Sequence, residues 1–206
     1  MDDAGAANLT SFAECGGTLA VGFHSGAVDD NCHVRLGGYP GGFRETLGVR
    51  TDELFPLLPG ETRQLTGQVP QDATATLWSE RIRLTSAEAI ASYADGPLAG
   101  VPAVTRNAHG TGTAWYLATR PDPATLGVLL ARIRDEAGVR PVLATAPDGI
   151  EAVRRSGTDA DYLFLIDHSG AGGELPAHGV ELLTGKSVHG SVTVPARGVA
   201  VVRETR

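Results

Sequence analysis

Lysine, cysteine and aromatic residues are scarce in this chain, and long apolar runs are missing. Among its 206 residues, lysine occurs once, cysteine twice, and aromatic residues make up 5%. With a net charge of −7 and no basic cluster beyond Arg154–Arg155, the chain lacks the basic surface that nucleic-acid binding needs. No apolar stretch approaches the roughly 20 residues that span a bilayer. We therefore expect neither a nucleic-acid partner nor a membrane partner.

The two cysteines and the N-terminus indicate a cellular compartment. Two cysteines do not make a disulfide framework, so we expect Cys15 and Cys32 to be free thiols. A bridge between them is the alternative, with nothing in the sequence to favour it. The opening residues, MDDAGAANL, are acidic where a signal peptide is basic. We expect no export signal and a cytoplasmic protein.

Residues 1–138 carry helix and strand signals together. Apolar spacing predicts a helix over residues 4–15 that stops at Gly16, and an unbroken apolar run predicts a strand over 19–23, buried on both faces as in a parallel sheet. A loop (26–42), a short helix (43–47) and a strand-rich stretch (50–119) follow. Asp122 and Pro123 begin a helix that ends at Gly138. Since no strand precedes the first helix, the chain looks as if it begins inside a β-α-β unit.

The last third has no helical pattern. Pro141 and Pro147 mark a boundary, and residues 150–206 show short strands separated by Gly, Ser and Pro clusters. The pattern predicts a small antiparallel β-sandwich over residues 141–206.

No pattern of catalytic, cofactor or metal residues emerges. The turn after the first strand, CGGTLAVGFHSG, is built like a nucleophile elbow but carries neither cysteine nor G-x-S-x-G. The stretch DDNCHVR lacks a second ligand group for a metal, and GTGTAW lacks the lysine or the following helix of a phosphate loop. We expect no catalytic residue, cofactor or metal site.

We expect structural rather than catalytic roles for the acidic and aromatic side chains. Glu53, Glu80 and Asp167 alternate with apolar neighbours, which predicts side chains in solvent rather than a catalytic pair. The aromatic residues are expected to be core or interface anchors, with carbohydrate contact as the alternative; they are Tyr39, Trp78, Tyr93 and Trp115.

The order of motifs resembles one enzyme family. The stretch from AANLTSFAECGGTL through HVRLGGYPGGFRE, then YADGPLAGVPAVTRNAHGTGTAWYLAT, is similar to the trimerisation domain of family-42 β-galactosidases. GIEAVRRSG, YLFLIDHS and PARGVAVVRE resemble the C-terminal domain of those enzymes. The resemblance implies an incomplete class I glutamine amidotransferase-like (flavodoxin-like) α/β layer over residues 1–138, a truncated trimerisation domain, followed by the β-sandwich. It also implies that both catalytic glutamates lie on a barrel domain with no counterpart here.

The function that follows is a non-catalytic assembly or accessory part of a β-galactosidase, in a family whose members form trimers and hydrolyse terminal β-D-galactosides. The loop with Asp29, Asp30, Arg35, Tyr39 and Arg44 mixes charged and aromatic residues, which is typical of an interface rim. We expect this loop to face a neighbouring subunit, with strand addition at an uncovered sheet edge as another route to self-association. The alternatives are a carbohydrate-binding module, with weak sugar binding, and an amidotransferase-like enzyme.

Overall fold

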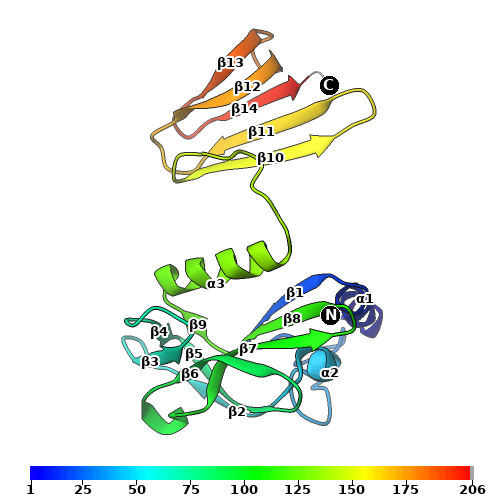
Figure 1. Cartoon of the computed structure of the whole chain (residues 1–206), viewed down its shortest axis with the longest axis vertical. Helices are drawn as coiled ribbons and strands as arrows, with labels where there is room; N and C mark the ends of the chain where they lie inside the picture. The colour runs from blue at the N-terminus through cyan, green and yellow to red at the C-terminus, as the bar shows by residue number, and fades with distance from the viewer. Residues whose placement is uncertain (205–206) are drawn as a thin grey trace. The chain divides into compact units, whose positions relative to one another are not determined.

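A computed structural model describes residues 1–204 and divides the chain into two compact units, Met1–Val139 and Arg140–Arg206 (Figure 1). The helices of unit 1 are α1 (Asp3–Glu14), α2 (Arg44–Leu47) and α3 (Pro123–Glu136), with 3-10 turns η1 (Gly41–Phe43) and η2 (Gly96–Leu98). Its strands are β1 (Thr18–Gly22), β2 (Val49–Pro56), β3 (Thr62–Gly67), β4 (Thr74–Thr76), β5 (Trp78–Leu84), β6 (Glu88–Tyr93), β7 (Pro102–His109), β8 (Gly112–Leu117) and β9 (Arg120–Pro121). No helix among the described residues is long and apolar enough to cross a membrane.

The structure contains both long helices that the sequence predicts, although α1 begins and ends one residue before the expected range of 4–15. Asp2 accepts a hydrogen bond from the Gly5 N–H at 2.8 Å at the start of α1, and Asp122 accepts one from the Thr125 N–H at 2.9 Å at the start of α3. Past the ends of α1 and α3, Gly16 and Gly138 take positive φ values of 104° and 66°. Both helix predictions are confirmed.

The sheets of unit 1 correct the predicted fold class. A seven-stranded sheet runs in the order β1-β8-β7-β6-β3-β4-β9, and β2 pairs separately with β5. Only the pair β1–β8 is parallel among the described strands; the others are antiparallel. The flavodoxin-like, class I glutamine amidotransferase-like layer is therefore wrong. That fold needs a crossover helix between successive parallel strands, whereas residues 49–121 connect their strands by turns.

The first strand also differs from its prediction. Leu19 and Val21 are buried, but Ala20 and Gly22 are exposed, because β1 lies at the edge of its sheet and is covered well on one face only. An apolar alanine or glycine on the second face does not need a covering layer.

Strand β8 carries the core of unit 1 on both its faces. Ala114 and Tyr116 belong to the apolar cluster that includes Ala6 and Ala13 of α1. Trp115 and Leu117 belong to the cluster that includes residues of α3. The period-2 alternation of a strand thus places α1 and α3 on opposite faces of β8.

Unit 2 contains β10 (Ile150–Ser156), β11 (Asp161–Asp167), β12 (Gly173–Glu181), β13 (Ser187–Val194) and β14 (Val199–Glu204). These form one antiparallel sheet in the order β10-β11-β14-β12-β13. All the strands contribute to a single apolar cluster, with Leu163, Leu175, Val192 and Val202 among its members. The antiparallel strands were predicted correctly, but the structure shows one sheet around this core and not the two stacked sheets of a sandwich.

Candidate functional site

The turn after β1 carries an aromatic cluster. His24 adopts φ 63°, a left-handed conformation that is uncommon outside glycine. Its ring lies 4.0 Å from the Trp78 ring, and the Phe23 ring is stacked 6.1 Å from Trp78. The position where an enzyme of the elbow type would hold a nucleophile therefore holds packed rings.

A buried carboxylate lies beneath this cluster. Glu80 is 1% exposed, and its Oε1 accepts hydrogen bonds from the Trp78 Nε1–H at 3.1 Å and the His24 N–H at 3.4 Å. Its Oε2 accepts from the Tyr116 hydroxyl at 2.6 Å and the Thr51 hydroxyl at 3.1 Å. Four donors from separate segments thus converge on one carboxylate, which is what a buried charge requires.

The tyrosines around Glu80 have raised pKa values. Burial, followed by the negative charge of Glu80, raises the pKa of Tyr116 far above its usual range. Burial also raises the pKa of Tyr93 to about 12. Both hydroxyls stay protonated at neutral pH, so this group is a hydrogen-bonded anchor for the turn and contains no activated nucleophile.

The burial of Glu80 corrects a prediction, and Asp167 repeats the correction in unit 2. Asp167 accepts hydrogen bonds from the N–H groups of Ser169 (2.9 Å), Gly170 (2.9 Å), Gly172 (3.1 Å) and Arg197 (2.7 Å). A hydrogen bond from the Ser169 hydroxyl, followed by those from the N–H groups, holds the pKa of Asp167 well below its usual range. Of the three acids expected in solvent, Glu53 alone is exposed.

Burial also decides the roles of two aromatic candidates. Trp115 and Tyr93 are fully buried, so they are core residues and cannot stack on an external sugar. Trp78 and Tyr39 are half-buried.

The loop of residues 26–42 and the start of α2 hold the predicted interface residues, and most of them are engaged within the chain. Arg35 is ion-paired with Asp3 and donates to the Met1 carbonyl at 3.1 Å. Arg44 donates to the Gly37 carbonyl. Asp29 accepts from the His33 N–H at 2.8 Å. These bonds fix the loop rather than leaving its charges free for a partner.

Asp30 and Tyr39 complete the predicted set. Asp30 is exposed and accepts from the Asn31 side chain at 3.3 Å. Tyr39 accepts a backbone hydrogen bond from the Thr51 N–H at 2.8 Å, which ties the end of the loop to β2. The structure thus places four of the predicted residues along the loop and the fifth, Arg44, at the start of α2.

The same loop exposes apolar side chains that the sequence reading missed. Leu36 is 90% exposed, Val34 59% and Val28 37%. A leucine held in water on a loop fixed by ion pairs suits a contact surface better than a core. The signal that could have found it is the apolar pair in HVRL, flanked by charge.

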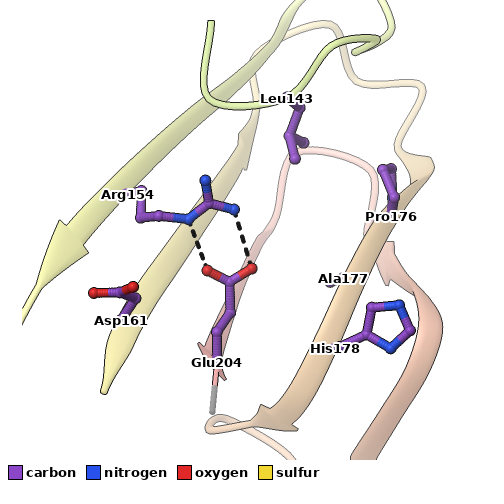
Figure 2. A pocket seen from close by; sticks show the side chains of 7 residues that line it. All are labelled: Leu143, Arg154, Asp161, Pro176, Ala177, His178 and Glu204. Carbon is purple, nitrogen blue, oxygen red and sulfur yellow. Dashed lines mark hydrogen bonds and ion pairs between the residues drawn. The ribbon is translucent and has the colours of Figure 1, made fainter. Parts of the chain in front are cut away.

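Unit 2 contains a pocket of about 420 Å³, shown in Figure 2. Arg154 binds Glu204 through two hydrogen bonds, at 2.7 and 3.1 Å, so these two charges compensate each other. Leu143, Pro176 and Ala177 form its apolar wall. The pocket is open and has no polar group that is both buried and free. Among residues 1–204, His, Cys, Asp and Glu form no cluster of three or more that could hold a metal ion.

The fold and these sites define an accessory class of protein: two mostly β units whose buried acids serve as structural anchors. Comparison with known proteins gives the family. The family model described as the β-galactosidase trimerisation domain matches residues 1–140, and the one described as the β-galactosidase C-terminal domain matches residues 149–204. The chain belongs to the family-42 β-galactosidases and corresponds to these two non-catalytic domains.

Individual relatives agree. A β-galactosidase from an Arthrobacter species is 44% identical over 205 residues, which cover 99% of this chain and 28% of the relative. The LacZ β-galactosidase of Heyndrickxia coagulans is 41% identical, over 95% of this chain and 29% of its own length. The crystal structure of the β-galactosidase from Bacillus circulans sp. alkalophilus matches with a TM-score of 0.82 and 34% identity, over 97% of this chain and 31% of that one. The chain thus spans less than a third of the length of these relatives, and none of these matches supports an amidotransferase.

Proposed function

We propose that this chain assembles with copies of itself through the loop of residues 26–42, and that it serves a β-galactosidase which hydrolyses terminal β-D-galactosides. The observation that carries the proposal is Leu36, which is 90% exposed on a loop whose one arginine, Arg35, is ion-paired within the chain. Fully burying a leucine side chain stabilises by about 1.5–3 kcal/mol. In a symmetric trimer this contribution would recur at each of the equivalent contacts.

The test is the oligomeric state of the Leu36→Asp variant, measured by sedimentation velocity and light scattering at tens of micromolar. We expect the wild-type chain to self-associate and the variant to associate about tenfold to a hundredfold more weakly, since an aspartate would place an unpaired charge in the contact. Leu58→Asp is the matched control, because Leu58 is 69% exposed on another loop of the same unit. A monomeric wild-type chain, or equal losses in both variants, would contradict the proposal.

We also propose that the chain itself does not hydrolyse glycosides and that it works in the cytoplasm. The buried acids Glu80 and Asp167 are saturated with donors, and they lie in different units. Both cysteines are free and exposed, which fits a reducing compartment. Incubation of the purified chain with a chromogenic β-galactoside should release no leaving group above a heat-killed control. Turnover that disappears when one acid is changed to its amide would refute this.

A further inference from the structure

The hairpin of β12 and β13 places two histidines directly opposite each other. The register of this antiparallel pair sets His178 against His189. Residues in such a position share one face of the sheet, with Cβ atoms about 4.5–5.5 Å apart. Their neighbours Ala177 and Val188 point into the core of unit 2, so both imidazoles are on the outer face, where both residues are exposed.

Neither imidazole is committed to another group. Within residues 1–204, no hydrogen bond or ion pair involves the side chain of His178 or His189, whereas His168 is bound to Glu151 at 2.9 Å. In Figure 2 the His178 ring points away from the Arg154–Glu204 ion pair. Both rings are therefore free to change rotamer, as exposed side chains do within nanoseconds.

Two imidazoles on facing strands are the donor set of a chelate. Imidazole nitrogens bind zinc, copper and nickel, with zinc–nitrogen distances of about 2.0–2.1 Å. We propose that His178 and His189 together bind one divalent transition-metal ion, with water completing its coordination sphere. A site with two protein ligands agrees with the finding that, among the described residues, no three His, Cys, Asp or Glu side chains cluster as metal ligands.

A positive charge on the same face of the sheet is already compensated. Arg203 of β14 lies opposite Val180, two residues from His178 and on the same face. Its guanidinium donates to Asp159 at 2.8 Å, so its positive charge is compensated.

A cross-strand link at the two histidines would stabilise a part of the hairpin that contains glycines. Each histidine is followed by a glycine with positive φ, Gly179 at 141° and Gly190 at 100°. Glycine in a strand interior weakens pairing. Moreover, β12 pairs with β14 only at Val180 and Glu181, so most of the hairpin depends on its own two strands. A bound metal ion would reduce local opening of this hairpin.

The experiment uses the full chain with Cys15 and Cys32 changed to serine, so that thiolates do not compete for metal. Calorimetric titration with NiCl2 measures affinity and stoichiometry, and NMR measures paramagnetic broadening of the six histidine rings. The variants are His178→Gln and His189→Gln. His33→Gln is the control, because the side chain of His33 is 79% exposed in the other unit.

We expect one nickel ion per chain, broadening centred on the rings of His178 and His189, and slower amide exchange in β12 and β13. Loss of even a hydrogen bond to a metal ligand commonly costs about tenfold in affinity, so either glutamine variant should lose at least that factor while the control keeps wild-type affinity. No binding, broadening centred on other histidines, or unchanged affinity in the two variants would each overturn the proposal.

Discussion

Replacing Glu80 by alanine removes the acceptor that joins the turn after β1 to the core of unit 1. The substitution leaves the hydroxyls of Tyr116 and Thr51, from residues 1% and 2% exposed, without their shared acceptor. It also removes the partner of the Trp78 indole N–H. The turn at His24 then loses its hydrogen bond to β5 and keeps only its ring contacts with Trp78.

The size of the effect follows from these groups. A buried donor left unpaired costs about 1–3 kcal/mol, and two such hydroxyls together with a small cavity give a loss of about 3–5 kcal/mol. Glu80→Gln should cost only about 1 kcal/mol, because both hydroxyls can reverse and accept from the new amide while its oxygen keeps the Trp78 bond. The difference between the two variants is the quantity that tests the network.

Urea unfolding followed by tryptophan fluorescence measures both variants. Trp78 and Trp115, the two tryptophans of the chain, both lie in unit 1, so the signal reports that unit by itself. Glu53→Ala is the control, because Glu53 is exposed on β2, and a surface change of this kind should stay within about 0.5 kcal/mol. A loss below about 1 kcal/mol for Glu80→Ala, or equal losses for alanine and glutamine, would refute the reasoning.

Three further predictions concern capping, backbone space and pH. Hydrogen bonds from Thr125 and Thr74 lower the pKa of Asp122 to about 2. The stability that this carboxylate contributes is therefore present above its ordinary pKa of 3.8 and is lost as the pH falls toward 2. Asp122→Asn should flatten this part of the pH–stability curve of unit 1. Gly110→Ala should destabilise unit 1 strongly, because φ is 59° and the new Cβ would lie 2.3 Å from the Glu14 carbonyl oxygen. Gly60→Ala is the control: Gly60 also has a positive φ but lies in open space, so this variant should lose less stability in the same urea assay. The Asp167 carboxylate accepts hydrogen bonds from the N–H groups of Gly170 and Gly172, so Asp167→Asn should speed amide exchange at these two residues. Unchanged exchange would contradict the anchoring role of Asp167.

Local features of the fold could be predicted from the sequence, because their causes are local. An N-cap aspartate, a stripe of leucines and a glycine after the last turn define α3 within one short segment. Strand pairing has no such signal. Thr18 pairs with Thr113 and Leu65 pairs with Tyr93, and the sequence around these residues does not indicate which strands pair. The family resemblance implied a flavodoxin-like layer, and the helix followed by an apolar strand agreed with it. That local pattern could not show that β1 has one parallel neighbour in an otherwise antiparallel sheet.

The acids show the same limit at the level of single side chains. Alternation predicts the face of a strand on which a residue lies, but it cannot show that donors from residues 24, 51, 78 and 116 meet at Glu80. A carboxylate among apolar neighbours was therefore assigned to solvent, where its charge costs nothing. In the structure the Glu80 carboxylate is instead buried, and both of its oxygens accept hydrogen bonds.

That pairing explains why the turn after β1 has the shape of a nucleophile elbow without its chemistry. A nucleophile there would need an unpaired side chain beside free N–H donors. Here the His24 N–H is already bonded to Glu80, and the rings of Phe23, His24 and Trp78 occupy the surface above it. The backbone N–H at the tip of the turn therefore binds β5 and is not available to stabilise a reaction. The buried carboxylate of Glu80 therefore holds the shape of this turn and joins it to the core of unit 1.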